Sequence, residues 1–211
     1  KTIQKPKKQP QEPKPEEYDE IRVKVMSQPK FTNFGKKNPD LMEIAISGKK
    51  DTALAYAKQV LAKEIKASEV FKEGQFVDVH AVSKGKGFQG TVKRYGVKIR
   101  QHKSEKTKRG VGTLGPWTPK RVRWSVGQPG KMGYHTRTEY NKHILKINNK
   151  PEEINPKGGL VRYGLVKNEY LLIKGSVVGP KKRAILLTEP IRSKERPNQI
   201  QITYVHQESQ Q

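Results

Sequence analysis

The sequence predicts a mainly β fold, a twisted antiparallel barrel or sandwich, with one short helical insertion and a long basic internal loop. Short segments of alternating apolar and polar residues recur along the chain and are punctuated by glycine and proline. One segment has the clear periodicity of an amphipathic helix. Residues 84–137 differ from the rest, because they hold 15 Lys and Arg against one Glu, and ten of the chain's 18 glycines.

Residues 1–17, "KTIQKPKKQPQEPKPEE", contain one aliphatic residue, Ile3. Such a segment buries too little apolar area to offset the entropy of ordering. We expect an extended tail or linker.

Residues 18–83 are expected to form the first part of the β structure. The segments "IRVKVMS" from Ile21 and "LMEIAIS" from Leu41 alternate like half-buried strands, and "QFVDVHAV" ends near Val82 as a third strand. The helix is predicted over residues 51–63, with Asp51 as its cap. Its apolar face comprises Ala53, Leu54, Ala57, Val60 and Leu61. "SEVF" after Ala67 predicts one short helical turn.

Residues 138–211 are expected to supply the remaining strands and a C-terminal tail. Four segments have strand character: "YNKHILKI", "YLLIKGSVV", "RAILLTE" and "IQITYVH".

The chain carries 44 Lys and Arg against 20 Asp and Glu, a net charge of +24 over 211 residues, of which 32% are hydrophobic. Self-repulsion at this level favours a polyanionic partner. Nucleic acid is the first candidate, because phosphate binding releases condensed counterions. An anionic membrane surface is the second, and it is disfavoured because no apolar run approaches the roughly 20 residues of a membrane span. The absence of cysteine excludes disulfides and thiolate metal sites.

The segment 84–137 has a net charge of +14, from 15 basic residues and Glu105. A loop of this length in a compact domain is expected to be functional or to fold against a partner. We expect it to be unordered without RNA, because like charges repel along it.

Two motif readings are disfavoured in this region. "GKGFQG" matches G-x-G-x-x-G, but no helix and no acidic strand end are predicted after it, as a dinucleotide site requires. Thr91 stands where a P-loop requires lysine.

The five histidines lack helical metal-ligand spacing, and Ser83, Ser104 and Ser125 lack a nucleophile-elbow context. We therefore predict no metal, no cofactor and no catalysis.

Both tryptophans lie in the basic segment. Trp117, between Pro116 and Pro119 in "GTLGPWTP", is predicted to stack on RNA at a loop tip. For Trp124 two interpretations stay open. It packs a small satellite core, within a short strand "VRWSV", or it contacts RNA.

The blocks "KGKGFQGTVKRYGVK", "GTLGPWTPKRVRWSVGQPGKMGYHTRTEYNK" and "KGSVVGPKKR" closely resemble the ribosomal protein L three family, archaeal or eukaryotic type. The resemblance runs from about Ile21 to about Val205. It implies an antiparallel barrel of the translation-protein type, with an internal extension that enters large-subunit rRNA (23S-type) and reaches toward the peptidyl transferase centre. It further implies a role in subunit assembly, a cytoplasmic ribosomal location and a neighbouring ribosomal protein, L fourteen. Family members are usually longer at the N-terminus, so we expect that part, with its basic arm, to be missing here.

The resemblance places the tip at Gly115, Pro116 and Trp117. The RNA-binding residues expected from charge, position and resemblance are Lys84, Lys86, Gly87, Phe88, Gln89, Lys93, Arg94, Lys98, Arg100, His102, Lys103, Lys106, Lys108, Arg109, Trp117, Lys120, Arg121, Arg123, Trp124, Gln128, Lys131, His135 and Arg137.

The sequence thus predicts a structural rRNA-binding protein without a small-molecule substrate. The alternatives are an RNA-modifying enzyme, whose basic loop would position its substrate, and a generic polyanion-binding module.

Overall fold

A computed structural model describes residues 18–61, 63–104, 106–192 and 200–209. The predicted tail, residues 1–17, lies outside them. The chain divides into two compact units. The first comprises described residues of 1–74, 145–172 and 199–211, and the second those of 75–144 and 173–198. Strand β6, Thr136–Asn148, belongs to both.

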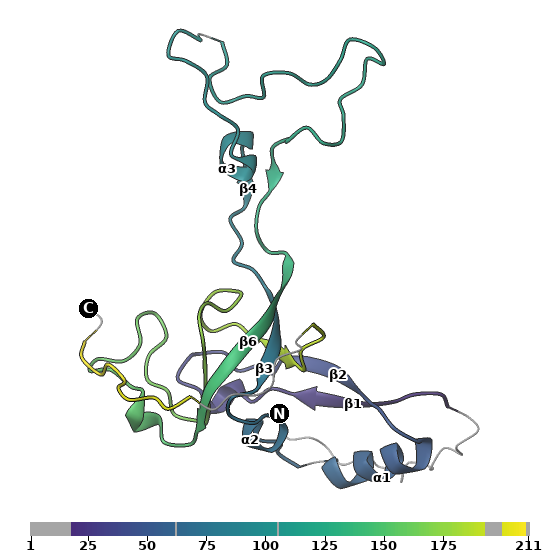
Figure 1. Cartoon of the computed structure of the whole chain (residues 1–211), viewed down its shortest axis with the longest axis vertical. Helices are drawn as coiled ribbons and strands as arrows, with labels where there is room; N and C mark the ends of the chain where they lie inside the picture. The colour runs from purple at the N-terminus through teal and green to yellow at the C-terminus, as the bar shows by residue number, and fades with distance from the viewer. Residues whose placement is uncertain (1–17, 62, 105, 193–199, 210–211) are drawn as a thin grey trace. The chain divides into compact units, whose positions relative to one another are not determined.

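An antiparallel hairpin begins the first unit. It consists of β1, Ile21–Met26, and β2, Leu41–Ile46, with a 3-10 turn at Pro29–Phe31 between them (Figure 1). The register pairs Val23 with Ile44 and Val25 with Met42, so the apolar residues share one face. Both predicted strands are confirmed. Burial alternates along β1 as predicted, whereas every residue of β2 except Ile46 is exposed.

Two helices follow the hairpin: α1, Lys50–Val60, and α2, Ala67–Val70. Ala53 is buried and Leu54, Ala57 and Val60 are half-buried, as the predicted apolar face requires, but Leu61 is 71% exposed. Leu61 departs from helical geometry with a ψ of 128°, so α1 ends before residue 63.

The predicted cap at Asp51 is wrong. Lys49 occupies the N-cap position. Asp51 lies in the first turn, where its negative charge interacts favourably with the positive end of the helix dipole.

The four-stranded sheet has the strand order β7-β6-β3-β8, and its central strand β3 pairs antiparallel with β6 and β8. The bounds are Phe76–Val82 for β3, Tyr170–Ile173 for β7 and Leu186–Thr188 for β8. Val77, Val79 and Ile144 are fully buried and form the core of the second unit. Burial of these apolar side chains stabilises the sheet from which the basic segment starts.

A β-bulge interrupts β6 opposite Asp78. Val77 pairs with Lys142 and Val79 with Glu139, so β6 holds one extra residue. Asn141 adopts a left-handed φ of 54° there and donates its N–H to Asp78 Oδ1 at 2.8 Å. Asp78 Oδ2 accepts the N–H of Ile191 at 3.1 Å. The fully buried carboxylate is therefore bonded at both oxygens, as burial of a polar group requires.

The mainly β class is confirmed, but the described strands form three separate sheets and do not close into a barrel. β7 and β8 are also shorter than predicted. Gly175, with a φ of 85°, lies just beyond the end of β7. The predicted strand "IQITYVH" is wrong. Residues 200–206 join no described strand, because alternation alone makes an extended segment and a strand also needs a neighbouring edge to pair with.

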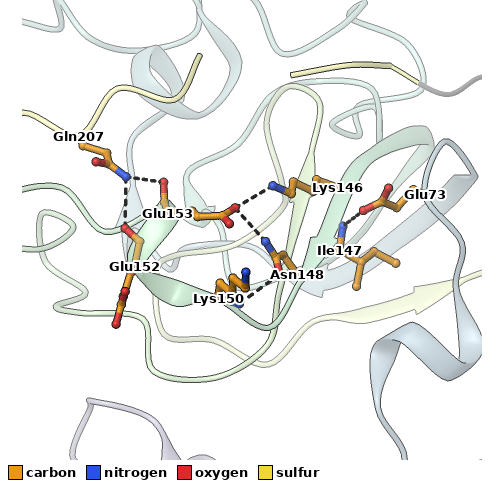
Figure 2. A network of polar contacts seen from close by, with 8 residues as sticks. All are labelled: Glu73, Lys146, Ile147, Asn148, Lys150, Glu152, Glu153 and Gln207. Atoms are coloured by element: carbon orange, nitrogen blue, oxygen red, sulfur yellow. Dashed lines mark hydrogen bonds and ion pairs between the residues drawn. The ribbon is translucent and has the colours of Figure 1, made fainter. Parts of the chain in front are cut away.

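A polar network in the first unit ties the end of β6 to the 3-10 turn Pro151–Glu153 (Figure 2). The Glu153 carboxylate accepts hydrogen bonds from Lys146 Nζ at 2.7 Å and from Asn148 Nδ2 at 2.8 Å. Gln207 joins the C-terminal segment to the turn, because its side-chain amide donates to the carbonyls of Glu152 and Glu153. This network predicts a pH dependence.

The hydrogen bond from Lys146 lowers the pKa of Glu153 below its usual range, and the same bond raises the pKa of Lys146. The carboxylate's contribution is therefore complete above the ordinary pKa of glutamate and is lost as the pH falls through the depressed value. We expect the unfolding midpoint of Glu153→Gln to lie slightly below that of the wild type at pH 7, and the gap to close in acid. Glu152→Gln is the control, because Glu152 enters the network through its backbone carbonyl. A gap that persists or widens in acid would contradict the prediction.

Candidate nucleic-acid interface

The basic segment, residues 84–137, starts as a two-stranded ribbon that continues β3 and β6 (Figure 1). Ser83 N donates to His135 O, Lys86 N to Met132 O and Met132 N to Gly87 O, each at 2.9 Å. The short strands β4, Phe88–Gln89, and β5, Gly130–Lys131, extend the same ladder. The segment is therefore anchored through backbone hydrogen bonds to the best-buried sheet of the chain.

A short helix, α3, Thr91–Tyr95, opens directly after Gly90, where none was predicted. Gly96 ends it in the left-handed conformation with a φ of 69°. A helix of five residues is too short to be recognised from the periodicity of its apolar residues. No parallel strand follows it among the described residues, so the dinucleotide reading gains no support.

Arg94 fastens α3 to the returning chain. Its Nη1 donates to Gln128 O at 2.7 Å, and its guanidinium lies 5.0 Å from the centre of the Tyr95 ring. Glycines make room for both side chains. A Cβ at Gly130 would stand 2.8 Å from Arg94 Nη1, and one at Gly127 would stand 2.8 Å from the Tyr95 ring. The glycines of "GQPGKMG" thus permit close packing in a segment without an apolar core.

Between residues 97 and 126 the described chain has no helix or strand and is held by turns. Arg100 N donates to Lys108 O at 3.1 Å, and Arg100 Nη2 donates to Val111 O at 2.9 Å. Two of the predicted RNA-binding arginines, Arg94 and Arg100, therefore also hold the segment's own backbone. A guanidinium has five N–H donors, so donors remain for a phosphate at both positions.

The aromatic side chains of the segment are strongly exposed. Trp117 is 86% exposed, Trp124 98% and Phe88 77%. The satellite-core interpretation of Trp124 and the short strand around it are therefore wrong. Alternation in "VRWSV" reflects no buried face, because residues 122–125 are exposed and Val126 alone is half-buried.

Trp117 lies in a tight turn of the predicted tip. Lys120 N donates to Trp117 O at 3.0 Å, and Lys120 takes a left-handed φ of 61°. Gly115 has a φ of 138°, a region that residues with a side chain rarely adopt. The turn presents the indole to solvent.

Exposure extends to nearly all the predicted RNA-binding residues. Gln89, Arg94 and His135 are half-buried, and all the others are exposed. Apart from Glu105, which is outside the described residues, the segment has no acidic residue to pair with its cations. The result is a protein surface with a dense positive charge, without an internal counter-charge in its described part.

The described residues show no metal site and no membrane-spanning helix. They contain no group of three or more His, Asp and Glu placed to hold a metal ion. His80, in the sheet, is bonded to the hydroxyls of Thr138 and Thr188 at 2.8 and 3.0 Å, and His143 stacks on Phe76 at 4.7 Å. None of the helices in the described part is long and apolar enough to span a bilayer.

Residues 7–211 match the family model described as Ribosomal protein L3. This chain belongs to that family. It is 50% identical over 197 residues to large ribosomal subunit protein uL3 of Methanocaldococcus jannaschii, covering 92% of this chain and 59% of the relative. It is 48% identical over 198 residues to the uL3 of Methanopyrus kandleri, covering 92% and 55%. The chain thus spans somewhat over half the length of these archaeal relatives.

The family match includes the whole basic segment, and it begins earlier and ends later than the quoted blocks indicated.

Sequence reasoning did not find the structural roles of Arg94 and Arg100. Their signal was weak, since an arginine that bonds a backbone carbonyl looks in sequence like one that binds phosphate.

The close backbone contact at Gly133 predicts that a side chain there would destabilise the ribbon. A Cβ at Gly133 would stand 2.1 Å from Lys84 O, and Gly133 has a φ of 72°. We expect Gly133→Ala to cost the ribbon about 1–3 kcal/mol and to speed amide exchange at Lys86 and Met132 roughly tenfold per 1.4 kcal/mol. Gly112→Ala is the control, because nothing lies within 4 Å of its added Cβ. Equal protection in both variants would show that the ribbon does not need this close approach.

Proposed function

We propose that this chain is a structural constituent of the large ribosomal subunit and binds large-subunit rRNA through residues 84–137. The observation that carries the proposal is an extension with a net charge of +14, anchored by a hydrogen-bonded ribbon and exposed along nearly its whole length. The relatives that share the family are named large ribosomal subunit proteins. The chain acts as an architectural element and needs no catalytic group, metal or cofactor for this role.

Each part of the extension has a physical task in RNA binding. Lysine and arginine neutralise phosphates and release counterions, which supplies most of the affinity. The ribbon fixes where the extension starts. Trp117 and Trp124 offer flat apolar surfaces on which nucleobases stack, and arginine adds planar stacking. RNA would thereby cover the aromatic surface that no protein core covers.

Finer features follow from the family and form part of the proposal. The tip at Gly115, Pro116 and Trp117 extends toward the peptidyl transferase centre, and the chain supports assembly of the subunit in the cytoplasm. The ribosomal protein L fourteen is its expected neighbour. The four-stranded sheet belongs to a barrel of the translation type.

The salt dependence of binding tests the electrostatic part. We expect the triple substitution of Lys103, Lys106 and Lys108 by alanine to flatten the log–log slope of rRNA affinity against salt. The slope should change by about 0.7–0.9 for each phosphate that the variant no longer neutralises. The control replaces Lys30, Lys37 and Lys157, which lie outside the extension and are exposed. An equal change in both triple variants would favour a generic polyanion-binding module.

The stacking of Trp117 at the tip is tested by a different measurement, the chemical reactivity of rRNA bases. Trp117→Ala should weaken rRNA binding by about 5- to 150-fold at most, because one stacked base contributes about 1–3 kcal/mol. It should also change the chemical reactivity of rRNA bases at the tip. Tyr56→Ala, at a half-exposed aromatic on α1, is the control. Identical base reactivity in assembled subunits with wild-type and Trp117→Ala chains would exclude a tip contact through this residue.

A further inference from the structure

The block "KGSVVGPKKR", residues 174–183, is one of the three that carry the family resemblance, and it lies outside the extension. It follows β7 and precedes β8 within the second unit. Its first residue, Lys174, donates its N–H to His143 O of β6 at 2.9 Å, and Val178 is buried. The block is therefore fixed to the sheet before it reaches the base of the extension.

Two residues with a positive φ bring the end of the block against β3. Gly179 has a φ of 96°, and Lys182 takes a left-handed φ of 71°. A Cβ at Gly179 would stand 3.1 Å from Val82 O, so glycine allows the chain to come this close to the strand. The close approach places Arg183 beside the last residue of β3.

Arg183 bonds the backbone at the point where β3 ends and the extension begins. Its Nη1 donates to Val82 O at 2.8 Å and to Ser83 O at 2.9 Å, and its guanidinium lies 5.6 Å from the centre of the Tyr134 ring. One side chain thus contacts the outgoing strand and the returning strand together. Because Ser83 N donates to His135 O, these contacts are made at the first hydrogen bond of the ribbon.

The arginine side chain continues the work of a neighbouring strand. In the described register, β8 pairs with β3 from Asp78 to His80, and Leu186 lies opposite His80. Residue 183 would stand opposite residue 83 if this antiparallel register continued. A guanidinium is planar and rigid, so it can bond carbonyls and lie against a ring in one fixed orientation. The sheet is thereby linked to the base of the extension beyond the end of β8.

We propose that residues 174–183 form a brace and that Arg183 is a positioning residue, which fixes the direction in which the extension leaves the sheet. Residues 84–89 span about 20 Å at ~3.3 Å per residue, so a tilt of about 10° at their base moves their far end by about 3–4 Å. A binding surface needs its orientation held within about 10–20°. The brace is a property of the free chain, and its use in placing the extension on rRNA rests on the proposed function.

A role for Arg183 as one more phosphate ligand accounts for these contacts less well. The side chain is half-buried, and its Nη1 is bonded to two carbonyls of the chain itself. The adjacent Lys182 is exposed and carries the same charge. A residue that only neutralised phosphate could be replaced without any change in the direction of the extension in the free chain.

Distances measured in the free chain test the brace without RNA. Because the chain has no cysteine, spin labels can be attached by Lys93→Cys on α3 and Glu189→Cys just after β8, both exposed positions of the second unit. We expect a narrow distribution of distances between the labels. Arg183→Met, which keeps a long side chain but loses both bonds, should broaden it by about 3–4 Å, the displacement that a tilt of about 10° produces. Lys182→Met is the control, because it removes the same charge and should leave the distribution narrow.

Tyr134→Leu is a second variant, which decides the test if Arg183→Met does not fold. Tyr134 is 61% exposed, so its ring contributes little to the core, and its loss removes the aromatic partner of Arg183. The distribution should broaden, by less than in Arg183→Met. Variants with a distribution as narrow as that of the wild type, or a wild type as broad as the variants, would overturn the brace.

Directed cleavage in assembled subunits separates the brace from the proposed function. With a hydroxyl-radical probe at Leu114→Cys, near the tip turn, large subunits reconstituted with the full chain should be cut at one short rRNA segment. Arg183→Met should shift or spread these cuts, and Lys182→Met should not. Cuts that stay in place would show that RNA alone sets the direction and would overturn the positioning role. Absence of cleavage with Arg183 intact would overturn the proposed function, and the label distances would still decide the brace.

Discussion

Repulsion among like charges is the constraint on which the rest of this structure depends. A net charge of +14 within 54 residues opposes any compact arrangement of the extension. In the described chain, contacts that involve the backbone hold the extension against this repulsion. Ribbon hydrogen bonds, arginines that donate to carbonyls and glycines that permit close packing hold the segment without an apolar core. These contacts leave the charge itself uncompensated, and the proposed RNA partner would compensate it.

Within the second unit, a buried sheet and an exposed extension occupy different parts of the chain. The buried residues Val77, Val79 and Ile144, with the doubly bonded Asp78, supply a well-packed sheet in the second unit. The extension starts from the ends of two strands of this sheet. Most of its side chains stay exposed, because backbone hydrogen bonds hold the ribbon from which it starts. Trp117 is 86% exposed, which is unfavourable for an indole in water, and in the proposed complex RNA would cover it.

Sequence reasoning found the elements whose signal is local. The strands at Ile21, Leu41 and Phe76 and helix α1 follow from periodicity, and the extension follows from charge. It failed where a second segment decides the outcome. Residues 200–206 alternate but find no edge to pair with, "VRWSV" alternates without a buried face, and the clamp by Arg94 depends on a carbonyl 34 residues away. The positive charge of the extension was predictable from composition, whereas the pairing of its two ends in a ribbon needed the structure.

The central claim is that RNA supplies the packing that the extension lacks, and tryptophan quenching tests it most directly. Both tryptophans of the chain, Trp117 and Trp124, lie in the extension and are 86% and 98% exposed. A neutral quencher such as acrylamide should therefore quench the free chain nearly as well as free tryptophan, and saturating large-subunit rRNA should protect both residues. Tryptophans that resist quenching without RNA, or that stay accessible with RNA bound, would contradict the claim.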